Sequence, residues 1–292
     1  MGRTVPRRGV DSRTVRTSPR PLMVPVAGTA APTVSGRLSP MTDTLDPPTA
    51  ATAAAGAIDA RKTYGVGENA VHALDGIDVR FDPSRFTAIM GPSGSGKSTL
   101  LHCLAGLDSL SEGAVFIGDT YLATLNDKQL TRLRREQVGF VFQSYNLIPT
   151  LTAKENIVLP LRLGGEEGDP AWIDRVIDTV GLGDRLTHRP SELSGGQQQR
   201  VAVARALASR PTIIFADEPT GNLDSNSGAE ILQFMRDAVD HFGQTIVMVT
   251  HDPGAAAYAD RVVFLADGKI VHDMTGPDVD SIMEQMKHIG GR

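Results

Sequence analysis

The chain has 292 residues, of which 40% are hydrophobic and 22% charged, and its formal net charge is -5. This composition is ordinary for a globular protein with a sizeable core. The longest apolar runs have the length of strands and fall far short of the roughly 18 residues that indicate a membrane span. Because Cys103 is the single cysteine, no intramolecular disulfide or cysteine-rich zinc site can form, which fits a reducing compartment. The negative net charge argues mildly against generic nucleic-acid binding.

Residues 1–55 are predicted to be a disordered extension. The first forty residues carry seven arginines and one acid, Asp11, with many Ser, Thr and Pro residues and no periodic apolar pattern. Met41 is a candidate translation start, followed by a flexible leader. The alternative is an Arg-rich transit peptide, whereas a secretory signal is disfavoured because no apolar core follows the basic residues.

From residue 56 onward, short β-rich runs alternate with helical segments, which indicates an α/β fold with a mainly parallel sheet. Strands are predicted over residues 77–81, 86–90, 138–142, 212–216, 245–250 and 261–265. Helical patterns replace the strand signal at about residues 144–210, which indicates an inserted α-helical subdomain. A last helix is predicted at about residues 277–290, where apolar residues recur at helical spacing and are expected to pack onto the body. These residues are Val279, Ile282, Met283, Met286 and Ile289.

A glycine-rich segment follows the strand predicted over residues 86–90. It consists of Gly91, Pro92, Ser93, Gly94, Ser95, Gly96, Lys97, Ser98 and Thr99. This is the P-loop pattern in its required context, between a strand and a helix. Glycines let backbone N–H groups converge on phosphate oxygens, and the helix N-terminus adds partial positive charge. We expect Lys97 to bridge the β and γ phosphates of ATP, Ser98 to bind Mg²⁺, and Thr99 to donate to a phosphate oxygen.

Two adjacent acids, Asp217 and Glu218, follow the apolar strand predicted over residues 212–216. Side chains at the carboxyl end of a parallel strand face the ligand crevice. Asp217 is therefore expected to hold Mg²⁺, and Glu218 to orient or deprotonate the attacking water. Alone, such a pair is equally consistent with a solvated turn, but the P-loop upstream favours the functional interpretation.

A second small-residue loop distinguishes the chain from kinases, GTPases and helicases, which share the preceding two features. It consists of Leu193, Ser194, Gly195, Gly196 and Gln197, and a helical run follows it. Here the sequence resembles the ATP-binding cassette (ABC) family, whose signature is this pentapeptide. A loop that leads into a helix N-terminus offers another phosphate-binding surface. The resemblance implies a head-to-tail homodimer, in which each ATP lies between one subunit's P-loop and the other's signature.

The resemblance extends over about residues 60–270 and implies roles for four more residues. Tyr64 matches the aromatic residue that stacks on adenine, and Gln143 the glutamine that contacts Mg²⁺ and conveys nucleotide state to a membrane partner. Asp224 matches the acid that crosses the dimer interface, and His251 the histidine that reaches the γ-phosphate. The implied fold for residues 56–292 is a P-loop NTPase core with a mainly parallel sheet, an N-terminal antiparallel β region and the inserted helical subdomain.

Residues 144–156, 189–192 and 221–224 resemble the macrolide-export and lipoprotein-release branch of that family. The resemblance implies an ATPase at the cytoplasmic face of the membrane, driving a separate permease for export or extraction. The alternative is an ATPase that transmits force to a membrane partner regulating cell-wall enzymes. An ABC ATPase acting on DNA or ribosomes is disfavoured, because the chain has one P-loop and one signature and lacks sustained heptads. No nucleic-acid partner is expected.

Overall fold

The computed structural model describes residues 53–290, except for the side chain of Glu68. The disorder predicted for residues 1–52 lies outside the described residues. Ala53 and Ala54, which precede the predicted domain start at residue 56, are buried. The backbone of Ala54 pairs with neighbouring strands, donating to the Phe81 carbonyl at 2.8 Å and accepting from the Gly118 N–H at 2.9 Å. These bonds tie the chain to the sheet before the first strand begins.

Two sheets organise the described residues. The first is antiparallel, in the order β2-β1-β4-β5, and its strands are β1 (Ala55–Tyr64), β2 (Val71–Phe81), β4 (Glu112–Ile117) and β5 (Thr120–Tyr121). The second has the order β10-β9-β3-β8-β7-β6. Its strands are β3 (Phe86–Met90), β6 (Val138–Phe142), β7 (Ile213–Asp217), β8 (Ile246–Val249), β9 (Arg261–Ala266) and β10 (Lys269–Thr275). All neighbours in this second sheet are parallel except β10, which pairs antiparallel with β9.

Apolar cores cover both faces of the parallel strands. In β7, Ile214 and Ala216 belong to the core cluster on the side of α5 and α6, whereas Ile213 and Phe215 belong to the cluster on the side of α1. Successive residues of a strand point to opposite faces. A strand buried on both faces must therefore be continuously apolar, as β7 is up to Asp217.

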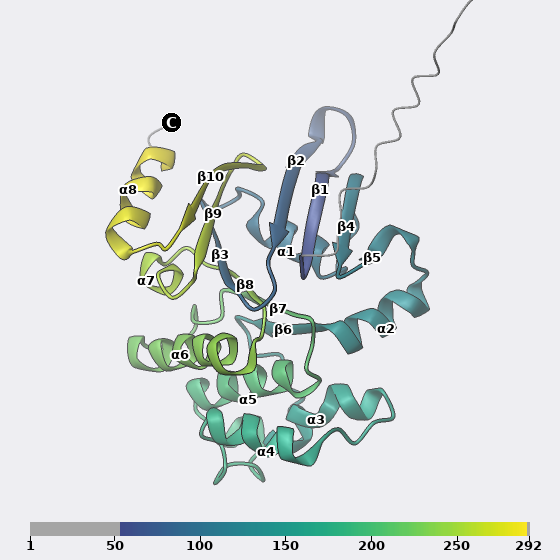
Figure 1. Cartoon of the computed structure of the whole chain (residues 1–292), viewed down its shortest axis with the longest axis vertical. Coiled ribbons are helices and arrows are strands. Elements are labelled where there is room, and N and C mark those ends of the chain that lie inside the picture. Colours follow the sequence, from purple (N-terminus) through teal and green to yellow (C-terminus); the bar gives the residue numbers. More distant parts are fainter. Residues whose placement is uncertain (1–52, 291–292) are drawn as a thin grey trace, which may run out of the picture. The chain divides into compact units, whose positions relative to one another are not determined.

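The other regular elements of residues 53–290 are helices. They are α1 (Lys97–Leu104), α2 (Asp127–Gln137), α3 (Ala153–Leu163), α4 (Pro170–Thr179), α5 (Gly195–Ala208), α6 (Ser225–Phe242), α7 (Pro253–Ala256) and α8 (Val279–Gly290), with short 3₁₀ turns at Gly67–Asn69, Leu122–Thr124 and Pro190–Glu192. Residues 144–210, all of them described, contain α3, α4 and α5 and no strand. These three helices lie together, with α6 beside α5 (Figure 1). No helix within residues 53–290 is long and apolar enough to cross a membrane.

The predicted apolar stripe of the last helix packs onto the body only in part. Ile282 is fully buried, and Met286 and Ile289 pack against the core while partly exposed. Val279 and Met283 remain exposed. The helix α8 packs on α7, and α7 is a single turn of four residues. We attribute the partial burial to this small surface.

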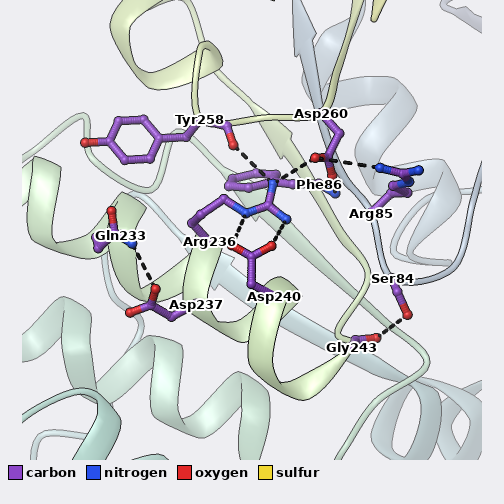
Figure 2. Close-up of polar contacts among 10 residues, drawn as sticks. All are labelled: Ser84, Arg85, Phe86, Gln233, Arg236, Asp237, Asp240, Gly243, Tyr258 and Asp260. Carbon is purple, nitrogen blue, oxygen red and sulfur yellow. Dashed lines mark hydrogen bonds and ion pairs between the residues drawn. The ribbon is translucent and has the colours of Figure 1, made fainter. Parts of the chain in front are cut away.

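A polar network ties α6 to the amino ends of β3 and β9 (Figure 2). The guanidinium of Arg236 donates to Asp260 Oδ1 at 3.2 Å, to the Tyr258 carbonyl at 3.3 Å and to both oxygens of Asp240 at 2.7 and 3.0 Å. Asp260 Oδ2 in turn accepts from the backbone N–H of Phe86 at 2.8 Å. Asp260 thus holds the first residue of β3, at the amino ends of the parallel strands.

We expect Arg236→Ala to lower the free energy of unfolding by about 2 kcal/mol. The Arg236 side chain is only 18% exposed, which places the effect between that of surface pairs and of fully buried ones. Urea denaturation measures the change. The control is Arg132→Ala, because Arg132 is 72% exposed and pairs with Glu136 on the surface, and its loss should cost under about 0.5 kcal/mol. Equal losses in both variants would contradict the structural role of the network.

Candidate active site

The residues predicted to bind nucleotide gather at the carboxyl ends of four neighbouring strands. The strands β3, β8, β7 and β6 are consecutive in the sheet. The P-loop follows β3, His251 follows β8, Asp217 ends β7, and Gln143 follows β6. This edge is where open α/β sheets bind ligands.

Two glycines of the P-loop occupy positions that no other residue can fill. Gly91 has φ 149° and Gly96 has φ 99°. A Cβ on Gly91 would lie 1.9 Å from the Leu265 carbonyl oxygen, and one on Gly96 would lie 2.3 Å from the Ala73 carbonyl oxygen. The loop is therefore wedged against β9 and β2, while Pro92, Ser93 and Gly94 are exposed. That leaves the backbone of the loop free to approach a phosphate chain.

Lys97 begins α1 and bends back over the loop. Its ammonium donates to the carbonyl oxygens of Gly91 at 2.9 Å and Pro92 at 2.8 Å. Burial lowers the pKa of Lys97 below its ordinary value, and the charges of Glu218 and Asp217 oppose this shift. The loop thus holds a cation within the influence of the two strand-end acids.

Ser98 and Asp217 meet although 119 positions separate them in the sequence. The Ser98 hydroxyl donates to Asp217 Oδ1 at 3.1 Å, and His102 Nε2 lies 3.6 Å from Asp217 Oδ2. A hydroxyl and a carboxylate are hard oxygen donors, so the pair fits Mg²⁺. Residues 53–290 contain no cluster of three or more His, Cys, Asp or Glu side chains suited to a metal. Mg²⁺ bound by one or two protein oxygens, waters and substrate phosphates needs none.

Gln143, the other predicted metal-contacting residue, is engaged with the loop before α6. Its Nε2 donates to Asn222 Oδ1 at 3.3 Å, and Asn222 Nδ2 donates to the Gln143 carbonyl at 3.0 Å. Both residues are exposed. The structure therefore brings Gln143 to the site edge, in contact with Asn222.

Glu218 and His251 form a direct pair. His251 Nδ1 lies 2.9 Å from Glu218 Oε1. Glu218 has φ 47°, in the left-handed region that non-glycine residues adopt only uncommonly. Its backbone N–H donates to the Val249 carbonyl at 3.0 Å, which extends the β7–β8 pairing by one residue. A carboxylate is therefore held beside the Ser98–Asp217 pair with an imidazole at hydrogen-bonding distance.

The signature loop caps α5. The Ser194 hydroxyl accepts from the Gln197 N–H at 3.2 Å, and Gln197 Oε1 accepts from the Ser194 N–H at 2.9 Å. Leu193 departs from the prediction, because its side chain is buried in the core and does not reach the surface of the loop. Gly195 and Gly196 are half-buried, and a Cβ on Gly196 would lie 3.0 Å from Ser227 Oγ at the start of α6. The loop thus packs against the α6 terminus.

Asp224 is the N-cap of α6. Its carboxylate accepts from the N–H groups of Asn226 and Ser227, both at 3.1 Å, and from the Ser227 hydroxyl at 2.7 Å. These bonds lower the pKa of Asp224. Asp224 is exposed. Its partner Ser227 lies next to the signature loop, so Asp224 is close to that loop.

The P-loop and the signature loop belong to different parts of the fold. The helix α1 packs against β1, β2, β4, β7 and β8, whereas α5 packs against α3, α4, α6 and β6. Figure 1 shows α1 beside the sheets and α5 in the helical region. Tyr64, the predicted adenine contact, ends β1 in the antiparallel sheet and is 44% exposed.

One residue of the site escaped the sequence analysis. Gln199 of α5 is fully buried, and its Nε2 donates to the carbonyl oxygens of Phe142 and Pro219. It therefore joins the signature helix to the ends of β6 and β7. Phe142 directly precedes Gln143, and Pro219 directly follows Glu218. The available signal was a polar residue at the same helical face as Ala202, Val203 and Ala206, since such a side chain must find partners in the interior.

A glycine-rich loop between strand and helix, with an acid pair at the end of another parallel strand of the same sheet, defines a P-loop nucleoside triphosphatase. Residues 74–221 match the family model described as ABC transporter. The chain belongs to the ABC transporter family, as its ATP-binding cassette, and it is an ATPase. The predicted family and fold class are confirmed.

Known relatives share most of the folded body. The chain is 48% identical over 225 residues to the macrolide export ATP-binding/permease protein MacB of Marinobacter nauticus, covering 76% of this chain and 35% of that protein. It is 45% identical over 216 residues to the uncharacterized ABC transporter ATP-binding protein MJ0796 of Methanocaldococcus jannaschii, covering 72% of this chain and 92% of that one. The chain thus spans about a third of the macrolide export relative and most of the second.

Solved structures of MJ0796 have the same fold. A dimeric structure of that cassette has a TM-score of 0.70 and 41% identity, over 76% of this chain and 99% of the other. A dimeric post-hydrolysis structure of it, bound to ADP and Pi, has a TM-score of 0.68 at the same identity and coverage. Cassettes similar to this chain therefore form dimers.

We expect Lys97→Ala to weaken ATP binding more than tenfold. Charge-assisted hydrogen bonds to phosphate contribute roughly 1.5 to 3 kcal/mol each, and the substitution removes the cation of the loop. Isothermal calorimetry measures the dissociation constant. The control is Lys128→Ala, which removes an exposed lysine of α2 and should leave the affinity unchanged. An unaltered dissociation constant for Lys97→Ala would refute the placement of phosphate at this loop.

Proposed function

We propose that this chain is the ATP-hydrolysing subunit of an ABC exporter, which pairs head to tail with a second copy and drives a separate membrane permease. The observation that carries the proposal is the separation of the P-loop on α1 from the signature loop on α5. Both loops present a helix N-terminus, which attracts phosphate. One copy alone leaves each loop facing outward, and a second copy in head-to-tail orientation completes both sites.

The hydrolytic roles follow from the contacts of the site. Lys97 and the P-loop N–H groups bind the β and γ phosphates, and Ser98 and Asp217 hold Mg²⁺, which neutralises phosphate charge when bound. Glu218 accepts a proton from the attacking water. The water oxygen bonds to the γ-phosphorus as the bond to the β–γ bridging oxygen breaks, yielding ADP and phosphate. His251 orients Glu218 and reaches the γ-phosphate.

The remaining predicted residues act around this centre. Tyr64 stacks on adenine, and Gln143 contacts Mg²⁺ and relays nucleotide state toward the permease. From the partner's side, Ser194, Gly195, Gly196 and Gln197 contact the phosphates, and Asp224 crosses the interface. Leu193 supports the loop from the core.

Export as the process rests on similarity to the macrolide export protein, whose name joins ATP-binding and permease functions. A separate permease is supported by the relative MJ0796, an ATP-binding protein of which 92% is covered, and by the lack of a membrane-spanning helix in residues 53–290. Location at the cytoplasmic face of the membrane, as a peripheral subunit, follows from this pairing.

We expect Glu218→Gln to bind ATP normally but to hydrolyse it at least about a hundredfold more slowly, because an amide cannot accept the proton of water. ATP and Mg²⁺ should then hold the protein as a dimer in size-exclusion chromatography. Glu166→Gln, a substitution at an exposed loop residue, is the control and should turn over at the wild-type rate. Normal turnover of Glu218→Gln would remove Glu218 from its role as base.

The head-to-tail arrangement makes a sharper prediction. Lys97→Ala lacks the phosphate clamp, and Ser194→Arg places a bulky side chain in the signature loop, so each variant should fail to trap ATP alone. In a mixed dimer, one site carries both defects, whereas the other pairs an intact P-loop with an intact signature. We therefore expect the mixture to trap ATP above the sum of the separate variants.

Filter binding of labelled nucleotide measures trapping, and differently tagged subunits verify that mixed dimers form. Hydrolysis is followed in parallel, because coupled sites need not turn over singly. Verified mixed dimers that trap no ATP would overturn the composite-site model.

A further inference from the structure

A carboxylate from the loop after α1 holds the side chain of Tyr64. The Tyr64 hydroxyl donates to Asp108 Oδ2 at 2.6 Å. The other oxygen of the same carboxylate, Oδ1, accepts from the Lys62 ammonium at 2.7 Å. Lys62 also donates to the Ser109 carbonyl at 2.6 Å. One half-buried carboxylate therefore joins two side chains of β1 that lie two positions apart.

The Lys62 ammonium also limits how the Tyr64 ring can be approached. It lies 4.8 Å from the ring centroid, a cation–π distance. Lys62 is only 8% exposed, whereas Tyr64 is 44% exposed. The cation thus covers the ring from the inside, and the exposed part of the ring remains available to a planar base.

Asp108 lies in the loop that follows α1, the helix that starts at the P-loop. The helix α1 begins at Lys97 and ends at Leu104, so its eight residues span about 12 Å. The segment that follows α1 is hydrogen-bonded to β1. The Ser111 N–H donates to the Arg61 carbonyl at 2.8 Å, and the Thr63 N–H donates to Ser111 Oγ at 3.0 Å. One short helix therefore connects the P-loop to the loop whose Asp108 holds the Tyr64 side chain.

The ionisation of the two groups keeps this bond in place. The hydrogen bond to Asp108 and burial raise the pKa of Tyr64 above its ordinary value, so the phenol stays a donor. Burial alone would raise the pKa of Asp108, but the hydrogen bonds from Lys62, Tyr64 and Ser109 outweigh burial and lower it. The carboxylate therefore stays an acceptor.

We propose that Asp108 is a positioning residue that orients the Tyr64 ring for the nucleobase, and thereby contributes to base affinity without contacting the phosphates. The inference rests on the proposed role of Tyr64 at adenine. A ring whose rotamer is set before binding loses less side-chain freedom when the base stacks on it. Lys62 balances the charge of Asp108, so the hydrogen bond between Tyr64 and Asp108 can form although the carboxylate is half-buried.

The test compares ATP with tripolyphosphate, which carries the phosphates without a base, each with Mg²⁺ in calorimetric titrations of the full chain. Tyr64→Phe keeps the ring and the Lys62–Asp108 pair but removes the tethered hydroxyl. We expect it to weaken ATP binding about threefold, within the range expected for freeing one side chain, and to leave tripolyphosphate binding unchanged. Asp108→Asn should produce a loss of the same kind, because Lys62 and Tyr64 use different oxygens of the carboxylate, and the substitution replaces one of them with an NH2 group that cannot accept.

Two controls test whether the loss of affinity is specific to Asp108 and depends on the Tyr64 ring. Asp127→Asn changes an exposed aspartate at the start of α2 and should alter neither affinity. In a Tyr64→Ala background, Asp108→Asn should cause no further loss of ATP affinity, because the ring that it orients is gone.

The outcomes separate this inference from the proposed function. If Tyr64→Ala leaves ATP affinity unchanged, the stacking role of Tyr64 itself fails. If Tyr64→Ala weakens ATP binding but Tyr64→Phe and Asp108→Asn do not, the positioning role of Asp108 is overturned alone. Equal losses for ATP and tripolyphosphate in Asp108→Asn would likewise overturn it, since they would reveal a structural effect on the whole site.

Discussion

The parallel register of β6, β7 and β8 is the constraint on which the site depends. Asp217 at the end of β7 is aligned with Phe142 of β6 on one side and with Val249 of β8 on the other. The residues that follow these three strands therefore emerge at one level of the sheet. A slip of one residue in either pairing would turn the strand's side chains to the opposite face and separate Glu218 from its neighbours.

The buried strands make this register costly to change. Both faces of β7 are covered by apolar cores, so a slip that moved Asp217 one position into the strand would bury its carboxylate, which is costly. At the opposite edge, the Asp260 carboxylate holds the first backbone N–H of β3. The strand that leads into the P-loop is thus fixed at its start by a polar bond and along its length by packing.

The nucleotide site draws on both sheets and on the helical region. In the site proposed above, the parallel sheet supplies the acids, the antiparallel sheet supplies Tyr64, and α5 supplies a second helix terminus for phosphate. Short polar bridges connect these parts. Gln199 links α5 to the ends of two parallel strands, and Asp108 links the end of α1 to Tyr64. These hydrogen bonds hold the parts in a defined relation.

The sequence by itself determined the features that depend on neighbouring residues. The strands of the parallel sheet, the P-loop, the acid pair and the signature were all predicted, because backbone preference, apolar periodicity and phosphate chemistry act within a few residues. The Ser194 cap and the strand-to-helix context of Lys97 belong to the same group.

Only the tertiary structure decided which distant residues meet. Ser98 reaches Asp217, His251 reaches Glu218 and Asp108 reaches Tyr64 through strand order and helix packing, which local patterns do not encode. The same holds for burial. Leu193 is buried although its neighbours are at the surface, and two of the five apolar residues of the last helix's stripe stay exposed, because burial depends on which surface the fold brings opposite each side chain.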